Sequence, residues 1–189
     1  MKIVGICGSA RQNSNSEHLL NIALEPFHDE GAEVKIHKVN DLQLQSCNGC
    51  GFCKKEGYCC LEDDVKHVYD DFLWADAIII ASPVFYRNIP SKLMIIFERA
   101  FAYQEKRPLG GKLGAAIAVG SGTCGGQCIV LSIIHNWYLS VGVLCVPGEL
   151  NGLSAVADAP GDILSDNRKI LQAKVLGKNL LEYSKKCMQ

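Results

Sequence analysis

The sequence predicts a doubly wound α/β fold, in which five parallel strands are covered by helices on both faces. Short apolar runs rich in β-branched residues alternate with longer amphipathic runs, which is the strand–helix alternation of such folds. The last three short runs are apolar on both alternating faces, as expected of strands buried between two helical layers. A length of 189 residues, with 48% hydrophobic and 21% charged residues, suits one domain spanning 1–189 with a sizeable core.

Five strands are predicted in the short apolar runs. The first leads directly into a glycine turn at Gly8, and the second precedes a stretch without apolar periodicity, 42–62, which we expect to be an insertion loop. The last precedes 147–165, where Gly, Pro and Asp are frequent and irregular structure is expected. In chain order the predicted strands are Ile3–Cys7, Val34–Val39, Ala77–Ser82, Leu113–Val119 and Val141–Val146.

Five helices are predicted in the longer amphipathic runs. The first begins at a capping-box pattern, in which Glu17 follows Ser14 by three positions. Pro26 removes a backbone donor from the last turn of this helix, so we expect a bend or an early stop near Glu25. The predicted helices are Asn15–Asp29, Asp63–Ala75, Pro90–Gln104, Gly126–Leu139 and Asp166–Lys186.

The composition excludes several classes of protein. With a formal net charge of −1, the chain lacks the basic surface that nucleic acids and anionic lipids attract, so neither is an expected partner. The longest apolar stretches, such as Ala77–Ala81, are far shorter than the roughly 20 residues of a membrane span. The N-terminus carries no export signal, so we expect a reducing, cytoplasmic setting. Ten cysteines in such a setting indicate metal-binding or redox-active thiols rather than a disulfide framework.

Three loops expected at one edge of the sheet form a candidate binding pocket. Gly8–Ser16 follows the first strand, and its hydroxyl, amide and Arg11 side chains, with the free N–H groups of a helix N-terminus, make a phosphate site. Ser82–Pro90 follows the third strand and offers flat aromatic surface. Gly120–Gln127 follows the fourth strand, and its four glycines let backbone approach a ligand closely. These loops are expected side by side, because parallel strands end at the same edge.

Each loop alone has a simpler interpretation. The three could be a capped βα turn, a proline–aromatic packing loop and a flexible turn. Gly8–Ser16 matches neither the dinucleotide fingerprint nor the P-loop, which counts against ATP, GTP and a Rossmann-type NAD site as the main ligand. Together, however, the loops describe a pocket for a flat ring with a phosphate tail, and flavin mononucleotide (FMN) is the predicted occupant.

Five of the ten cysteines lie within the fourteen residues 47–60, and their spacing predicts a metal centre. Cys47, Cys50 and Cys53 recur at intervals of three and Cys59 follows after a short arc, a compact arrangement that suits a [4Fe–4S] cluster. Zinc, and redox-active or structural thiols without metal, are the alternatives. Zinc sites with four thiolates usually use two separated C-x2-C pairs, which this motif does not have.

The remaining cysteines carry less information. Cys60 adjoins Cys59 and could replace it as the fourth ligand. Cys7 and Cys145 lie in apolar strands and are expected in the core. Cys124 lies in the glycine loop, where it could contact flavin or substrate, but no neighbouring base supports a catalytic role, and the sequence indicates no catalytic residue. No role is assigned to Cys128 and Cys187.

On these motifs, the whole chain resembles the iron–sulfur flavoprotein family, a flavodoxin-like branch of the NAD(P)H-dependent FMN reductases. The resemblance rests on Gly8-Ser9-x-Arg11-x-x-Ser14-Asn15-Ser16, Ser82-Pro83-Val84-Phe85-Tyr86, the glycine loop and above all the cysteine motif at 47–59. It implies a flavodoxin-like sheet with a cysteine-rich, cluster-binding loop at 42–62. It also implies a homodimer or homotetramer in which one subunit's cluster lies near another subunit's flavin.

The resemblance further implies contacts to the cofactor. The FMN phosphate would be held by Ser9, Arg11, Ser14, Asn15 and Ser16. The isoalloxazine ring would be lined by Pro83, Val84, Phe85, Tyr86 and Asn88, with Ser121 and Gly122 on its other side. The chain departs from the family pattern at Ala10, where proline is common, and at Arg87-Asn88, where small residues are common. The second departure puts a positive charge near the ring or a subunit contact.

Three functions are consistent with these features. The leading hypothesis is an electron-transfer flavoprotein. A low-potential donor such as ferredoxin would pass electrons to a [4Fe–4S] cluster and from there to FMN, which would reduce a small-molecule acceptor. The second is an NAD(P)H-dependent FMN or quinone reductase without a functional cluster. The third is a non-catalytic flavin- or metal-binding module that senses redox state through a partner.

Overall fold

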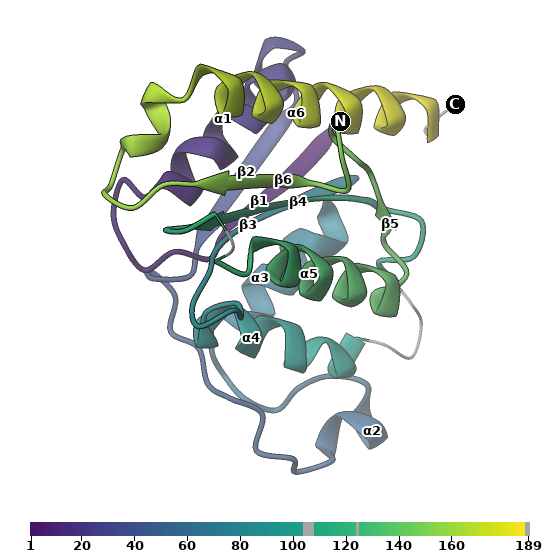
Figure 1. Cartoon of the computed structure of the whole chain (residues 1–189). Helices are drawn as coiled ribbons and strands as arrows, with labels where there is room; N and C mark the ends of the chain where they lie inside the picture. The colour runs from purple at the N-terminus through teal and green to yellow at the C-terminus, as the bar shows by residue number, and fades with distance from the viewer. Residues whose placement is uncertain (104–107, 124, 188–189) are drawn as a thin grey trace.

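The computed structural model describes residues 1–103, 108–123 and 125–187, and it has the predicted α/β architecture (Figure 1). Parallel strands run through the middle in the order β2-β1-β3-β4-β5, and β6 also pairs with β4. This is the strand order of a doubly wound fold, in which ligands bind beyond the carboxyl ends of the strands, where the winding direction reverses. Here the reversal lies between β1 and β3.

The first four predicted strands are confirmed, and the fifth is confirmed only in part. Val141 belongs to the preceding helix, and Gly142 ends that helix with a left-handed φ of +85°, so only two residues of the predicted run pair with the sheet. The strands are β1 (Lys2–Cys7), β2 (Glu33–Lys38), β3 (Ala77–Pro83), β4 (Leu113–Gly120), β5 (Leu144–Cys145) and β6 (Leu153–Val156).

The sheet has six strands rather than the predicted five. The short β5 pairs with the start of β4, where Leu144 lies opposite Leu113, and β6 pairs with its end, where Leu153 lies opposite Ile117. The two strands therefore occupy the same side of β4 in succession. The prediction of irregular structure throughout 147–165 is wrong at β6, because four residues are too few for their burial alternation to stand out among Gly, Pro and Asp.

The predicted helices are confirmed with small shifts of their ends. The run Pro90–Gln104 forms α4 and then a 3₁₀ turn, and Gln104 itself lies outside the described residues. The insertion loop contains a short helix, α2, that the sequence did not predict. The helices are α1 (Asn15–Asp29), α2 (Phe52–Glu56), α3 (Val65–Trp74), α4 (Ser91–Glu98), η1 (Arg99–Tyr103), α5 (Gln127–Val141), η2 (Asp162–Ser165) and α6 (Asn167–Cys187). None of those described is both long and apolar enough to cross a membrane.

Pro26 does not stop α1, which continues to Asp29, so the early stop expected near Glu25 does not occur. Proline removes only the N–H that would bond the carbonyl one turn earlier. Leu24 and Phe27, on either side of it, are completely buried, and their packing holds the last turn in place. The other end of α1 is as predicted, because the Ser14 hydroxyl accepts a hydrogen bond from the Glu17 backbone N–H at 3.2 Å.

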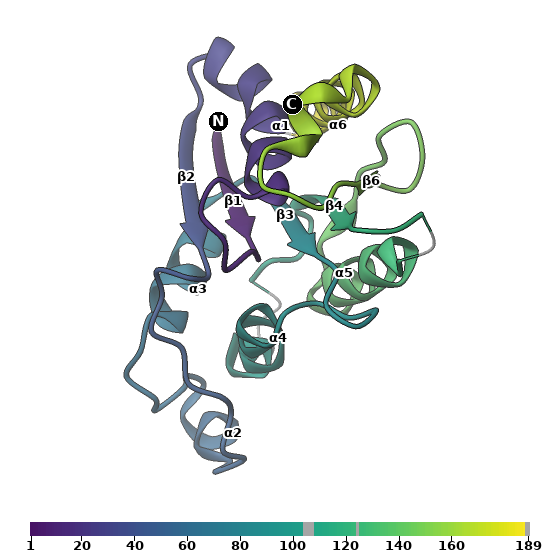
Figure 2. The same ribbon diagram turned by 60° about the vertical axis from the view of Figure 1, so that its left-hand side comes forward.

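Alternate residues of the central strands pack on opposite faces of the sheet. In β3, Ile78 and Ile80 belong to the core under α3, α4 and α5, whereas Ala77, Ile79 and Ala81 belong to the core under α1 and α6. Figures 1 and 2 show these two helical layers on either side of the strands. Burial on both faces explains why the central strands read as continuous apolar runs.

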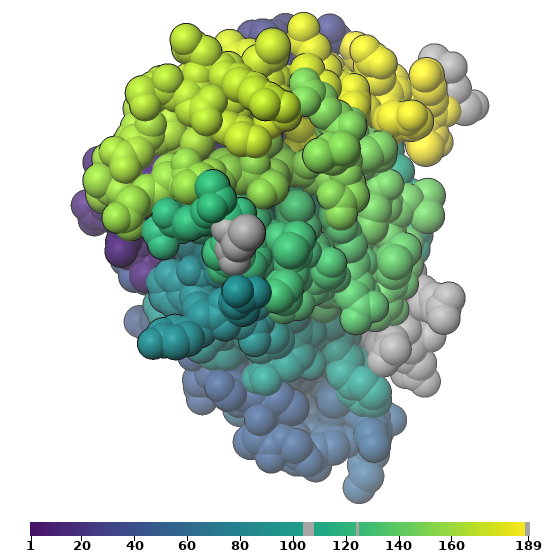
Figure 3. Space-filling model, viewed as in Figure 1, coloured from purple at the N-terminus to yellow at the C-terminus, as the bar shows by residue number. Residues whose placement is uncertain are grey.

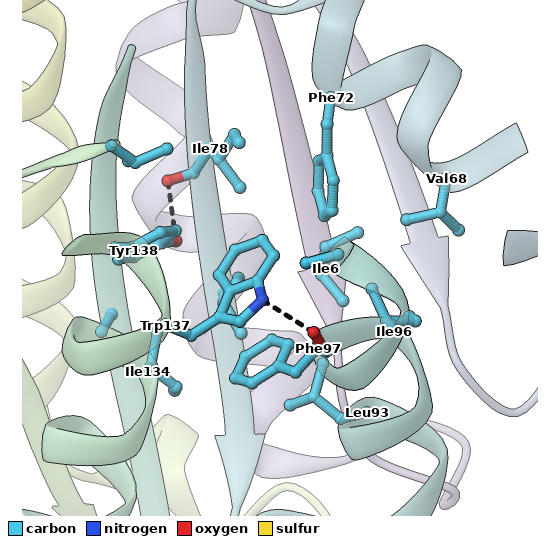
Figure 4. Close-up of a cluster of buried hydrophobic side chains, with 14 of the residues drawn as sticks. Ile6, Val68, Phe72, Ile78, Leu93, Ile96, Phe97, Ile134, Trp137 and Tyr138 are labelled. Atoms are coloured by element: carbon cyan, nitrogen blue, oxygen red, sulfur yellow. Dashed lines mark hydrogen bonds between the residues drawn. The ribbon is translucent and has the colours of Figure 1, made fainter. Parts of the chain in front are cut away.

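Aromatic side chains join α5 to the end of α4 (Figure 4). The Trp137 and Phe97 rings stack with centroids 4.5 Å apart, and the Trp137 Nε1–H donates to the Phe97 carbonyl at 3.2 Å. The Tyr138 hydroxyl bonds the Ile78 carbonyl of β3 at 3.1 Å. These contacts fix the end of α4 against the sheet, directly before η1 begins.

The segment around α2 projects from the rest of the chain. It lies at the end of the molecule away from α1 and α6, beyond α3 and α4 (Figures 1 and 2), and forms the lower end of the surface in Figure 3. Every residue of α2 is exposed or half-buried. The sheet therefore does not determine the conformation of this segment.

A Gly177→Ala substitution should destabilise the fold. A Cβ at Gly177 would lie 2.0 Å from the Ala23 carbonyl oxygen, so α6 could no longer approach α1 as closely. Alanine gains about 1 kcal/mol in helix propensity, but overpacking against rigid backbone costs roughly 1–3 kcal/mol or more, so we expect a net loss of stability. Urea unfolding checks this, with exposed Lys178→Ala as the control. A variant as stable as the unmodified chain would contradict the prediction.

Candidate functional site

A cavity of about 130 Å³ opens at the carboxyl ends of the central strands. Its walls come from the loops that follow β1, β3, β4 and β6. Nine of the residues predicted to hold FMN line it, namely Ser9, Arg11, Ser14, Asn15, Ser16, Pro83, Val84, Phe85 and Ser121. The structure thus brings together, in one hollow, side chains that lie far apart in the sequence.

The loop after β1 combines small hydroxyl groups with the beginning of a helix. Ser9, Ser14 and Ser16 are all buried, and the Ser9 hydroxyl accepts from the Arg11 backbone N–H at 3.2 Å. Gly8 permits close contact with both α4 and β3, because a Cβ there would lie 3.0 Å from Leu93 Cδ2 and 3.3 Å from the Ala81 carbonyl oxygen. Backbone N–H groups at a helix N-terminus favour an anion, so this wall suits a phosphate.

The loop after β3 makes a tight turn beside the cavity. Phe85 and Asn88 exchange two backbone hydrogen bonds, of 2.8 and 2.9 Å. The residues between them, Tyr86 and Arg87, have φ values of +48° and +62°, a left-handed conformation that costs roughly 1–2 kcal/mol for each non-glycine residue. The turn directs Tyr86 into solvent, where its side chain is fully exposed. Among the described residues, the cavity lining includes neither Tyr86 nor Asn88.

The glycine loop after β4 packs against this turn. Gly126 has a φ of +103°, and a Cβ on it would lie 2.9 Å from the Arg87 Cα, so the close contact needs glycine. The Gln127 amide bridges two neighbours, because its Nε2 donates to the Gly122 carbonyl at 2.8 Å and to the Ala155 carbonyl at 3.2 Å. Gly122 is also outside the described lining of the cavity. Cys124, which the sequence places where it could contact flavin or substrate, lies outside the described residues.

A fourth wall was missed by the sequence analysis. Ala157, Asp158 and Pro160 follow β6 and line the cavity. Asn15 attaches this wall to the phosphate loop, because its Nδ2 donates to the Ala159 carbonyl at 2.8 Å and its Oδ1 accepts from the Ile163 N–H at 3.2 Å. The turn-forming residues at 158–161 could have indicated a loop here. Because the sequence did not predict β6, nothing placed this loop at the edge of the sheet.

Arg11 spans two walls of the cavity. One terminal nitrogen, Nη1, donates to the Asp158 carbonyl at 3.2 Å, while the residue as a whole is exposed. A guanidinium has five N–H donors, so further donors remain for an anion. Arg11 is the cationic side chain among the described lining residues.

The cysteine loop is a separate feature, closed at its base by hydrogen bonds between its two ends. Gln45 donates its backbone N–H to the Asp63 carboxylate at 2.7 Å, and Gln43 does the same to Asp64 at 2.7 Å. Beyond this neck, Gly51 and Gly57 have left-handed φ values of +72° and +74° around α2. The chain can therefore turn sharply between successive cysteines.

The thiols of the loop lie in two different surroundings. The Cys50 and Cys60 sulfurs are 3.7 Å apart and exposed. The Phe52 backbone N–H and the Cys60 thiol lower the pKa of Cys50, and the same contact raises the pKa of Cys60. The Cys59 sulfur is half-buried instead and accepts a hydrogen bond from Arg99 at 3.2 Å.

Among the described residues, no three Cys, His, Asp or Glu side chains form a group that could hold a metal ion. The nine described cysteines are all free thiols, and Cys47 and Cys53 lie in the same loop as the three thiols above. Several thiols on one short loop are the kind of donor that iron–sulfur clusters use. The donor set therefore fits a cluster in its chemistry, while in the described conformation only the Cys50 and Cys60 sulfurs are in contact and no three thiols come together.

The sequence matches known families over most of its length. Residues 1–157 match the NADPH-dependent FMN reductase family. The chain is 34% identical to an iron–sulfur flavoprotein of Methanocaldococcus jannaschii, over 98% of each chain. It is 35% identical to an iron–sulfur flavoprotein of Methanosarcina thermophila, over 77% of each chain.

Solved structures show the same fold. A flavone reductase superimposes with a TM-score of 0.79 at 19% identity, covering 100% of this chain and 65% of that one. An NAD(P)H:quinone oxidoreductase from Methanothermobacter marburgensis gives a TM-score of 0.75 at 18% identity, covering 95% and 96%. An archaeal flavodoxin gives 0.64 at 16% identity, covering 98% and 99%. At these identities the likeness establishes a flavodoxin-like fold.

An Asn15→Ala substitution should loosen the wall at 157–163. It removes both hydrogen bonds of a buried amide, each worth about 0.5–1.5 kcal/mol net. We expect faster amide exchange in 157–163 and unchanged exchange in β1 and β3, measured by hydrogen–deuterium exchange with mass spectrometry. Asn21→Ala, on the exposed side of α1, is the control. Equal exchange in 157–163 for both variants would show that Asn15 does not hold this wall.

Proposed function

Because the chain belongs to the NADPH-dependent FMN reductase family, and within it to the iron–sulfur flavoproteins, we propose that it carries electrons from a low-potential donor through a [4Fe–4S] cluster and FMN to a small-molecule acceptor. The chain is a flavin-dependent oxidoreductase. A ferredoxin-like protein is the proposed donor. The observation that supports the flavin site most directly is the meeting of four loops in one cavity at the switch point of the sheet.

In this proposal the phosphate of FMN occupies the wall formed by the loop after β1. Arg11 and the helix N-terminus supply positive charge, and the hydroxyls of Ser9, Ser14 and Ser16 supply short hydrogen-bond donors. Asn15 contributes by holding the fourth wall in position. The bound phosphate would then fix the position of the whole cofactor in the cavity.

The isoalloxazine ring is proposed to lie between the loops after β3 and β4. Pro83, Val84 and Phe85 offer apolar surface, and Ser121 lies on the opposite side. Apolar walls exclude water from one side of the ring, while backbone groups of the loops reach its polar edge. Tyr86, Asn88 and Gly122 were predicted in the same role from resemblance, and this part of the prediction stays untested.

The [4Fe–4S] cluster is proposed to be held by Cys47, Cys50, Cys53 and Cys59 in a loop that can turn at its glycines. When bound, a cluster transfers electrons singly and FMN accepts or donates them singly or in pairs, so the two together match one-electron donors to two-electron acceptors. The protein supplies thiolate ligands, hydrogen bonds and burial, which set the potentials. A homodimer or homotetramer that places one subunit's loop near another's flavin is proposed as the working assembly, in the cytoplasm.

An NAD(P)H-dependent FMN or quinone reductase without a functional cluster is the second candidate. Two observations favour it: the thiols are not gathered in the described conformation, and a quinone oxidoreductase shares the fold. Its distinguishing property is rapid bleaching of bound FMN by NADPH, at the same rate after the loop cysteines are replaced.

Replacing Arg11 with Gln should weaken FMN binding by about 10- to 100-fold, because a hydrogen bond to a charged group is worth about 1.5–3 kcal/mol. Riboflavin lacks the phosphate, so its affinity should be unchanged. Quenching of flavin fluorescence measures both affinities. Arg168→Gln removes the same charge from the exposed start of α6 and is the control. Equal losses for FMN and riboflavin would mean that Arg11 does not contact the phosphate.

The cluster itself is tested by anaerobic reconstitution with iron and sulfide. The unmodified chain should gain iron and acid-labile sulfide in stoichiometric amounts, and Cys50→Ala should not, because a ligand is missing. Cys187→Ala, at the exposed end of α6, is the control and should behave as the unmodified chain. An unmodified chain that binds FMN, gains no iron and is bleached rapidly by NADPH would replace the proposal with the second candidate.

A further inference from the structure

Arg99 is the buried cation at the base of the cysteine loop. It is the first residue of η1, directly after α4, and its side chain is only 2% exposed. Its Nη1 donates to the Asp63 carboxylate at 2.5 Å, and the Asp63 side chain is buried to the same extent. Asp63 in turn accepts from the Gln45 N–H at 2.7 Å, so the ion pair lies inside the neck of the loop.

The Arg99 guanidinium reaches both ends of the loop at once. Nη1 also donates to the Gln45 carbonyl at 3.2 Å, before the cysteines, and Nη2 donates to the Leu61 carbonyl at 3.4 Å, after them. The neighbouring Glu98 carboxylate accepts from the Cys47 N–H at 2.7 Å. Two consecutive side chains, at the end of a helix fixed by Trp137 and Phe97, therefore position the loop.

The same guanidinium contacts a thiol. Nη2 donates to the Cys59 sulfur at 3.2 Å. Burial alone would lower the pKa of Arg99, but hydrogen bonds to Asp63 and Cys59 hold its pKa above the ordinary value, so it stays cationic. Its Nε–H is buried and has no partner among the described residues, which leaves one more donor on the group that contacts Cys59.

Stability alone is a poor reason for this arrangement. A buried ion pair is often no more stabilising than well-packed apolar residues of similar volume, because both charges must lose their hydration. A buried donor without a partner adds a further desolvation cost. A cation placed against one thiol of a five-cysteine loop does have an electrostatic effect, because it favours a more negative charge on that sulfur and on anything bound to it.

We propose that Arg99 is a positioning residue for the [4Fe–4S] cluster, which orients the Cys59 thiolate through the Nη2–H···Sγ hydrogen bond and raises the reduction potential of the cluster. This inference rests on the proposed function. Reduction adds one electron to the cluster, and a charge-assisted hydrogen bond to a ligand sulfur stabilises the reduced, more negative state. The Asp63 carboxylate offsets part of the cation's long-range field, so the direct hydrogen bond carries most of the effect.

Arg99→Lys keeps the charge but loses the planar fork that contacts Asp63, Cys59 and the two carbonyls together. After anaerobic reconstitution, we expect either loss of iron from a folded variant or a retained cluster with a lower midpoint potential, measured by redox titration followed by electron paramagnetic resonance. Arg168→Lys, on the exposed surface of α6, is the matched control and should leave both quantities unchanged. Circular dichroism shows whether each variant folds.

A second measurement needs no substitution at Arg99. The unmodified protein is labelled with nitrogen-15 in its arginine side chains and reduced, and pulsed electron paramagnetic resonance is used to detect coupling between the cluster's unpaired electron and an arginine nitrogen. Coupling supports the hydrogen bond to Cys59. A cluster-containing protein with no such coupling, or Arg99→Lys with an unchanged potential, would overturn the inference. If the unmodified chain binds no iron, the proposed function itself fails, and the two failures are thus distinguished.

Discussion

The rest of the structure depends on the burial of the central strands on both faces. β1, β3 and β4 present alternate side chains to two cores, one under α1 and α6 and one under α3, α4 and α5. Each of these three strands is followed by a helix that returns over one face, so that the strands are parallel and end at the same edge. The loops at that edge then come together without any direct attraction between them. The candidate flavin cavity is a consequence of the packing of the sheet.

This constraint explains which parts of the site could be predicted from the sequence. The apolar runs identify β1, β3 and β4, so the sequence places Ser9, Val84 and Ser121 at one edge of the sheet, where the structure has them. The wall at Asp158 was missed because β6 has four residues and its burial pattern is too short to recognise. The orientation of the Tyr86 side chain could not be predicted from the sequence either. It depends on a backbone turn in which Tyr86 and Arg87 are left-handed, a conformation that neither residue type favours.

For the cysteine loop, the sequence indicates the candidate chemistry but not the geometry. The chemistry proposed for it rests on spacing, since the intervals between Cys47, Cys50 and Cys53 are visible in the sequence. Its geometry does not, because the contacts that hold it come from Glu98 and Arg99, about 40 to 50 positions further along the chain. Arg99 resembles any other charged residue near the end of an amphipathic helix. Only its burial beside Asp63 separates it from the solvent-exposed arginines of the chain, such as Arg168.

The two sites therefore differ in how their shape is maintained. The shape of the candidate flavin cavity is set by a sheet with a large buried core. The loop beyond Gln45 and Asp63 lies outside that core, and α2 has exposed or half-buried residues throughout, so little apolar burial offsets the entropy of ordering it, which is about 1–2 kcal/mol per residue. Closing the neck lessens this cost, because it holds the two ends of the loop together before any ligand is bound. The Arg99–Asp63 pair holds the two ends of the loop together at its base, while the thiols beyond it remain free to change position. This freedom is consistent with a described conformation in which the cysteines are close in sequence but no three of them come together.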